Sequence, residues 1–432
     1  MDTEKKIRER LTFVIISIGL GMWGLASAMM RPTAHSISRV FSIEDAMDYE
    51  GRLYAILYIV YFALAIPAAL AIRRYGFKSG LVVGLTLFGA GTMSFIPGSQ
   101  LDSFEPFVVS YGVISAGMLM IETSATPYLL VFGPRRESMY RLLIGQMLSI
   151  VGWVTGYVIE RLYMTNTITD KDITARQMMD KITYAIMQRH DLLAVTSPYL
   201  RIGLIALLLA VVIAVTGFID RAQDENPNDA GLRTIFSRLA HDKVYLLGSL
   251  CQFGYVVAQT LTWASMMTFG SQLIMNSSAG ITKAEASSTA VQFVMTGVVI
   301  FGVVRFVCAI LAYKQRIRPA RSLAVACAVA GAISLVSMFL DGYACMIGML
   351  GISACMSIMY PTIYYLSMRR QDISGIQIGT VLQVLSIFGA ISTTYIMPSE
   401  NYEFLIELTT AIVFGLIAVF GVWCHKNDIG AK

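Results

Sequence analysis

The chain has 432 residues, of which 56% carry hydrophobic side chains and only 14% are charged, and its mean hydropathy is +0.64. Soluble globular chains are roughly 45–50% apolar and about 25% charged, so this composition excludes a soluble protein and favours an integral membrane protein. The formal net charge of +5 does not indicate a nucleic-acid partner, because in a membrane protein the placement of Lys and Arg sets the orientation.

Twelve stretches are apolar enough to span a bilayer, whose core of about 30 Å needs roughly 20 residues per helix. They are residues 11–34, 52–72, 79–98, 106–131, 140–163, 199–219, 244–274, 287–312, 321–340, 343–367, 375–397 and 403–424. We therefore predict an all-α integral membrane protein of twelve transmembrane helices in two six-helix halves, 1–219 and 244–432, joined by a cytoplasmic linker at 220–243.

The first stretch follows a short basic segment and so imitates a signal peptide. It lacks a convincing small-residue cleavage site, and we expect it to remain as the first membrane helix. Gly19, Gly21 and Gly24 spell a dinucleotide-binding motif within it. No strand precedes these glycines and no βαβ unit surrounds them, so close helix packing is the favoured use.

Lys and Arg gather on one side of the predicted helices. The N-terminus, the C-terminus and the loops after helices 2, 4, 6, 8 and 10 hold 22 of the 33. Cytoplasmic segments carry this excess, so we place both termini in the cytoplasm and the protein in the inner (plasma) membrane. On the outer side, Ile173, Met179, Ile182 and Ile186 follow helical spacing and predict an amphipathic helix within the loop 164–198.

An internal repeat supports the division into halves. A shift of 234 residues overlays Pro127 on Pro361, and the pair Arg135 and Arg136 on the pair Arg369 and Arg370. Helices 4 and 5 thus correspond to helices 10 and 11. Parallel repeats related about the membrane normal predict a substrate site between the halves, near the bilayer midplane.

Charged side chains within membrane helices cost about 2.5 to 3.5 kcal/mol each on insertion scales, so each requires a partner or a function. Glu122 lies five residues before Pro127 and is either one partner of a structural ion pair or a site for substrate or protons. Arg31 precedes Pro32, which predicts a break near the outer end of helix 1; it either joins a polar site or extends to the interface. For Arg305, packing, gating and substrate contact all remain open.

Helix 7 carries a polar stripe. Gln252, Tyr255, Gln259 and Trp263 recur at spacings of three, four and four, which places them on one face. Amides and aromatic rings suit a polyhydroxylated ligand, although hydrogen bonding between helices is the alternative. Further polar groups that extend this set are Gln146, Tyr360, Tyr364, Tyr365 and Gln383.

Motifs for catalysis are absent from the sequence. It contains no GxSxG, no Walker A loop and no His cluster at metal-ligand spacing. We therefore expect no enzymatic activity, no cofactor and no metal.

Several segments together resemble the fucose permease family, the L-fucose:proton symporters of the major facilitator superfamily. They are residues 121–127 with 132–134 and 141–146, the stripe 252–263, and residues 356–362. The resemblance implies that Glu122 falls on the family's helix 4 carboxylate, with roles in sugar recognition and proton handling. Gln146, Gln259 and Trp263 likewise match positions of the family pattern.

One departure from the family concerns charge. Aligning Trp23 and Gly24 with the family's Trp-Gly in helix 1 places Arg31 where the family has an aspartate central to proton coupling. Arg31 either neutralises Glu122 or anchors an anionic sugar through a bidentate guanidinium contact. Thr126 also replaces a family asparagine.

The combined prediction is a secondary transporter that imports a monosaccharide, fucose-like or a hexose, by alternating access and proton symport through Glu122. We expect the partners to be a sugar, protons and the lipid bilayer, and the protein to be a monomer. Two alternatives are a carrier of an acidic sugar or other organic anion that uses Arg31, and a non-transporting membrane sensor. The expected cavity residues are Arg31, Glu122, Gln146, Gln252, Tyr255, Gln259, Trp263 and Tyr360.

Overall fold

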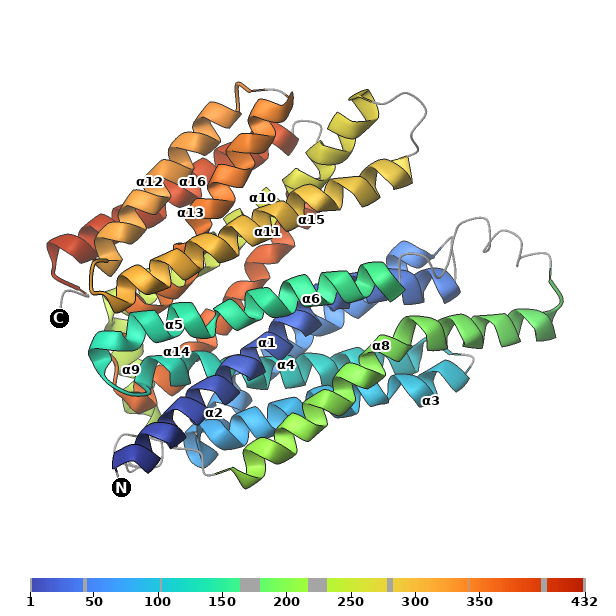
Figure 1. Cartoon of the computed structure of the whole chain (residues 1–432), viewed down its shortest axis with the longest axis horizontal. Helices are drawn as coiled ribbons and strands as arrows, with labels where there is room; N and C mark the ends of the chain where they lie inside the picture. The colour runs from blue at the N-terminus through green and yellow to red at the C-terminus, as the bar shows by residue number, and fades with distance from the viewer. Residues whose placement is uncertain are drawn as a thin grey trace. The chain divides into compact units, whose positions relative to one another are not determined.

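The computed structural model describes residues 2–41, 45–101, 103–163, 179–216, 231–277, 283–340, 342–397 and 402–429 (Figure 1). Within these ranges all regular elements are helices. They are α1 (Asp2–Phe41), α2 (Ala46–Met93), α3 (Phe95–Gln100), α4 (Glu105–Val131), η1 (Arg135–Glu137), α5 (Ser138–Gly145), α6 (Met147–Tyr163), α8 (Lys181–Val215), α9 (Leu232–His241), α10 (Lys243–Ser277), α11 (Lys283–Tyr313), α12 (Pro319–Ser337), α13 (Gly342–Met368), α14 (Ile373–Val384), η3 (Leu385–Ile391), α15 (Ser392–Ile396) and α16 (Tyr402–Lys426).

Eleven helical stretches of the described ranges are long and apolar enough to cross a membrane. One of them, Ala46–Gln100, has 55 residues, about 80 Å at 1.5 Å per residue, which far exceeds a bilayer core. Gly76 divides it, because its φ of 85° is non-helical and reverses the chain between two spans. With that division the stretches number twelve, and the predicted all-α membrane fold is confirmed.

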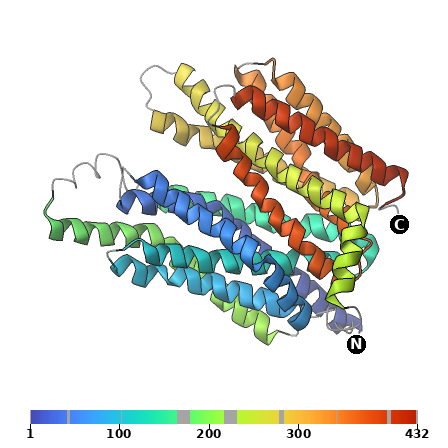
Figure 2. The ribbon, with the colours of Figure 1, turned by 180° about the vertical axis from the view of Figure 1, so that it is seen from behind.

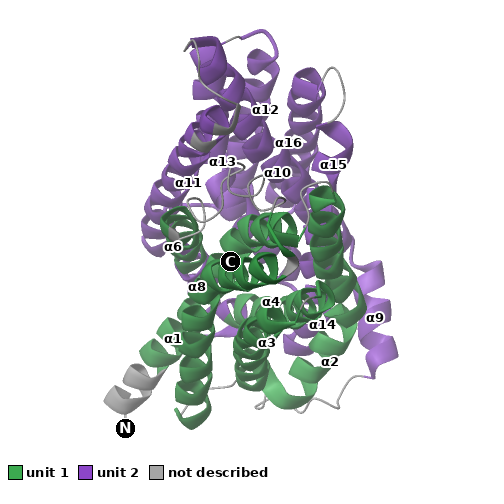
Figure 3. Ribbon diagram, turned by 90° about the vertical axis from the view of Figure 1, so that its right-hand side faces the viewer, with its two compact units in different colours: residues 1–128, 148–227 green, residues 129–147, 228–432 purple. Residues whose placement is uncertain are grey.

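The chain forms two compact units (Figure 3). The first comprises residues 1–128 and 148–227, and the second comprises residues 129–147 and 228–432. The short helix α5 therefore packs with the second unit, where it contacts α11 and α13. The division into halves at 219 and 244 stays a prediction, and residues 220–230 of the predicted linker lie outside the described residues.

Glycines allow close helix crossings in the first unit. A Cβ at Gly24 of α1 would lie 2.0 Å from the Ser149 carbonyl oxygen of α6, and one at Gly152 would lie 2.0 Å from the Gly21 carbonyl oxygen. Helices α2 and α4 approach in the same way, since a Cβ at Gly117 would lie 2.5 Å from the Phe88 nitrogen. The predicted use of Gly21 and Gly24 in helix packing is confirmed.

Helix α10 is the packing centre of the second unit. It contacts α11, α13, α16 and the run formed by α14, η3 and α15, which Figure 2 shows in orange-red along yellow-green α10. Seven residues of this run, Leu385–Ile391, are wound as a 3₁₀-helix, a length that is uncommon for that geometry. A Cβ at Gly389 would lie 2.8 Å from the Phe253 carbonyl oxygen, so the narrow turn brings this backbone close to α10.

Two local expectations are wrong. Helix α1 continues through Pro32 to Phe41, and the Met30 carbonyl near the proline accepts a hydrogen bond from the Tyr111 hydroxyl at 3.0 Å. The part of the loop 164–198 that the structure describes holds no separate surface helix, because α8 runs unbroken from Lys181 through Pro198 to Val215. Ile182 and Ile186 belong to α8 and are exposed, whereas Ile173 lies outside the described residues.

Candidate functional site

Glu122 of the first unit accepts a hydrogen bond from a neutral tyrosine. Its Oε2 accepts a hydrogen bond from the Tyr61 hydroxyl at 3.2 Å, and Trp23 Nε1 donates to that hydroxyl at 3.3 Å. These partners bring α1, α2 and α4 to one point; Tyr61 is fully buried, whereas Glu122 is only partly buried. A neutral hydroxyl orients a carboxylate without cancelling its charge.

Arg31 lies in a different environment, near the end of α1. It is exposed, and its guanidinium carbon lies 5.9 Å from the centroid of the Tyr54 ring, within cation–π range. One turn further, His35 Nδ1 lies 2.9 Å from Glu50 Oε2. Among the described residues Arg31 forms no ion pair with Glu122, so the pairing considered from the sequence is not found. Arg31 is eight residues beyond Trp23, about 12 Å along α1.

The stripe on α10 faces α13 in the second unit. The Tyr255 hydroxyl donates to the Met356 carbonyl at 3.2 Å, and the Tyr255 ring lies edge-on to Tyr360 at 5.9 Å between centroids. Trp263 Nε1 donates to Ser353 Oγ at 3.3 Å, and Gln259 lies one helical turn beyond Tyr255 on α10. The structure thus brings together four predicted residues, of which Gln259, Trp263 and Tyr360 are partly accessible.

The remaining predicted amides lie deeper in the second unit. Gln252 is 0% exposed, and neither its Oε1 nor its Nε2 has a hydrogen-bond partner among the described residues. Gln146 is buried at the end of α5, where α6 begins. Gln383 of α14 is buried too, and its Nε2 donates to Ser249 Oγ at 2.9 Å. Gln383 therefore links helices, which supports the alternative role that the sequence left open for such groups.

Pro361 in α13 explains the buried position of Arg305. Pro361 has no N–H, so the carbonyl of Ser357 one turn earlier in α13 loses its helical donor. Arg305 Nε donates to that carbonyl at 2.7 Å, and the guanidinium carbon lies 4.4 Å from the Phe301 ring centroid. Arg305 is only 4% exposed. The packing role that the sequence left open is therefore present in the structure.

Sequence reasoning missed two residues. Tyr61 lies in an apolar stretch where tyrosines are common, and nothing local indicates that it reaches Glu122. Glu407 lies within the predicted span 403–424 and is 5% exposed; its charge in an apolar stretch is the signal that could have identified it.

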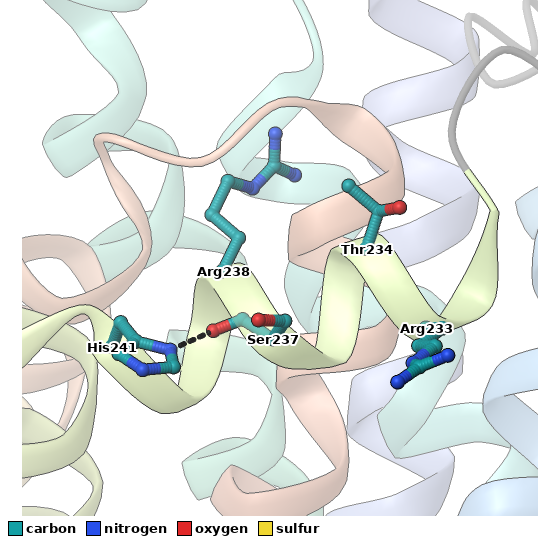
Figure 4. A pocket seen from close by; sticks show the side chains of 5 residues that line it. All are labelled: Arg233, Thr234, Ser237, Arg238 and His241. Atoms are coloured by element: carbon teal, nitrogen blue, oxygen red, sulfur yellow. Dashed lines mark hydrogen bonds between the residues drawn. The ribbon is translucent and has the colours of Figure 1, made fainter.

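A surface cavity lies on α9, outside the membrane-spanning stretches (Figure 4). Its lining residues are Arg233, Thr234, Ser237, Arg238 and His241. Arg238 is bonded to Asp372, which caps α14 by accepting from the Gly375 nitrogen at 2.7 Å. Burial alone would raise the pKa of the Asp372 carboxyl, but these hydrogen bonds hold that pKa below its usual value. No predicted cavity residue lines this cavity, and we do not assign substrate binding to it.

Comparison with known proteins supports one family. The model of the Major Facilitator Superfamily matches residues 11–393. The L-fucose-proton symporter of Haemophilus influenzae is 27% identical over 434 residues, 96% of each chain, and that of Escherichia coli is 27% identical over 95% of this chain and 92% of its own. A crystal structure of the transporter FucP in the outward conformation has 26% identity and a TM-score of 0.84, covering 96% of this chain and 99% of that one. The resemblance stated from the sequence is confirmed.

Proposed function

Because the chain belongs to the major facilitator superfamily, we propose that it is a secondary active transporter that imports a monosaccharide, fucose-like or a hexose, by alternating access with proton symport. The names of its relatives, L-fucose-proton symporters, support this substrate class. The observation that carries the proton role is Glu122, a partly buried acid in a membrane-spanning helix whose Tyr61 partner is neutral.

In this proposal each group of residues has a task. Glu122 takes up a proton from the outside and releases it inside, and its charge state changes its hydrogen bonds to sugar. The accessible aromatic and amide groups of the second unit hold the sugar ring and its hydroxyls. Deeper amides complete the cavity. The proposed substrate residues are Arg31, Glu122, Gln146, Gln252, Tyr255, Gln259, Trp263 and Tyr360.

We further propose that the protein works as a monomer in the plasma membrane, with both termini in the cytoplasm. The distribution of 22 of its 33 Lys and Arg residues supports that orientation. Its task is movement of substrate across the bilayer without chemical change, so it is not an enzyme.

The test is sugar uptake into proteoliposomes by the Glu122→Gln variant. Glutamine keeps the shape but cannot release a proton, so we expect exchange of sugar at equal pH to persist while accumulation driven by a pH gradient is lost. Glu105→Gln is the matched control, because Glu105 lies in the same helix and its side chain is 65% exposed. Undiminished gradient-driven accumulation in Glu122→Gln would refute the coupling role, and no uptake by wild type of any sugar would favour the membrane sensor.

A second candidate function is transport of an acidic sugar. Arg31 supports it, because its guanidinium is exposed and contacts a neutral Tyr54 ring rather than a carboxylate. Such a group can bind a substrate carboxylate through two parallel hydrogen bonds.

Uptake of a neutral hexose and of its uronic acid by wild type and Arg31→Ala distinguishes the two functions. If the substrate is anionic, the variant loses uronic acid uptake by about tenfold or more, the equivalent of one charge-assisted hydrogen bond at roughly 1.5 kcal/mol. If the substrate is neutral, hexose uptake stays near wild type. Equal uptake of the uronic acid by both proteins would exclude an anchoring role for Arg31.

A further inference from the structure

The contact between α12 and α16 encloses a carboxyl group that the transport proposal does not use. Glu407 lies on α16 and is 5% exposed. It faces α12, where the Ser334 side chain lies beside its carboxyl group. One carboxyl oxygen, Oε2, is buried and has no hydrogen-bond partner among the described residues.

The hydroxyl groups of Ser334 and Thr410 lie together at this contact. Thr410 Oγ1 lies 3.2 Å from Ser334 Oγ and 3.0 Å from the Glu407 carbonyl oxygen, so its single proton can serve only one of them. The cluster therefore contains more acceptor oxygens than its own hydroxyl protons satisfy.

No basic side chain compensates a charge here. Glu407 forms no ion pair among the described residues, and the elements that pack against α16 are α12, α10 and α15. The half of α10 nearest this end, 262–277, has no ionisable residue. The ionisable groups on the packed elements and on α16 itself are Cys327 two turns away, Arg321 at the opposite end of α12, Lys243, Tyr245, Cys251 and Tyr255 in the other half of α10, the exposed Tyr395 of α15, and Tyr402, Glu403, Cys424, His425 and Lys426 of α16.

A buried carboxylate without a partner is unfavourable by several kcal/mol, because it loses its hydration. A protonated carboxyl group is neutral and adds a hydrogen-bond donor. We propose that Glu407 is a second proton-binding site of this protein, separate from Glu122, in which a proton on the carboxyl group maintains the packing of α12 against α16. Loss of that proton at alkaline pH leaves a bare carboxylate between the two helices and loosens their contact.

Infrared spectroscopy of the full chain in lipid nanodiscs tests the protonation. At neutral pH we expect wild type to show the carbonyl stretching band of a protonated carboxylic acid, shifted in D₂O. This band should disappear in Glu407→Gln and persist in Glu122→Gln. A Glu407→Gln spectrum that retains the whole band overturns the proposal.

Ser334→Ala and thermal unfolding provide independent measurements. Ser334→Ala keeps the acid but removes the hydroxyl beside it, so the band should change frequency; an unchanged band overturns the assignment. The unfolding temperature of wild type should fall as the pH rises, while that of Glu407→Gln, which is neutral at every pH, stays constant. Parallel pH dependence of the two proteins, or recovery of wild-type stability by Na⁺ at alkaline pH, contradicts a proton site. These readouts need no substrate, so they are distinct from the uptake tests above.

Discussion

In the first unit the membrane-embedded charge that the sequence singled out is an acid, Glu122, partly accessible and bonded to the neutral hydroxyl of Tyr61. In the second unit it is a base, Arg305, buried and bonded to a backbone carbonyl that Pro361 leaves without its helical donor. The repeat places Pro127 and Pro361 at equivalent positions, but it places Glu122 opposite the apolar Met356. A common scaffold thus carries a partly accessible acid in one unit and a buried base, bonded to a backbone carbonyl, in the other.

Because of this difference, mutations near Glu122 and mutations near Arg305 should have different effects. A change near Glu122 alters a group whose charge state can vary during transport, so its effect depends on pH. A change near Arg305 removes a hydrogen bond that the proline-interrupted helix requires, so its effect is on stability. The expected effects below follow that division.

The largest effect is expected for Arg305→Ala. The variant leaves the Ser357 carbonyl without a donor and opens a space beside Phe301, which together should lower the stability by roughly 2 to 3 kcal/mol. Thermal unfolding of the purified protein in detergent measures the change. Arg321→Ala is the matched control, since Arg321 lies in α12 and is exposed, and it should unfold like wild type. If both variants unfold at the wild-type temperature, Arg305 does not support α13.

The sequence predicts the membrane spans well because each depends on a local apolar run, and it identifies Glu122 because an acid in such a run is rare. It does not reveal that Tyr61 reaches Glu122, since these residues are 61 positions apart and tyrosine is ordinary in a membrane helix. The support of Ser357 by Arg305 is likewise a tertiary contact, although Pro361 indicates where a donor is needed. The 3₁₀ winding of 385–391 leaves no clear signal in residue types.

Two tyrosines provide a matched comparison of the units. Tyr61 and Tyr255 are both 0% exposed, but the first donates to a carboxylate and the second to the Met356 carbonyl. Substitution by Phe removes the hydrogen bond of Tyr255 to Met356, and for Tyr61 it removes both the bond to Glu122 and the one from Trp23, so each should reduce the stability by about 1 kcal/mol per bond. Under the transport proposal, only Tyr61→Phe should also change the pH dependence of sugar uptake, because only its partner is an ionisable side chain. A pH profile of uptake that is changed equally by Tyr255→Phe would contradict the division between the units.

The smallest effect concerns ion pairs outside the membrane core. Arg238 and Asp372 connect α9 to α14 in the second unit, while Arg52 and Glu105 form an exposed pair at 2.6 Å in the first. Asp372 also caps α14. Exposed ion pairs contribute only about 0.2 to 1 kcal/mol to stability. If the Arg238–Asp372 pair contributes more than the Arg52–Glu105 pair, the excess comes from the hydrogen bond by which Asp372 caps α14.

Titration of stability with pH isolates the Asp372 contribution. The pKa of Asp372 is lower in the folded protein than its usual value, so its carboxylate stabilises the fold above the unfolded pKa of about 3.9. This stabilisation is lost as the pH falls through the folded pKa. The difference in unfolding temperature between wild type and Asp372→Asn should therefore be present at neutral pH and vanish in acid, because the neutral Asn amide caps the helix with a weaker hydrogen bond than the charge-assisted one of the carboxylate. Glu105→Gln should show a smaller difference in unfolding temperature at neutral pH, because this variant loses only the ion pair with Arg52. Equal differences for the two variants would mean that the contact between α9 and α14 contributes no more than an ordinary surface ion pair.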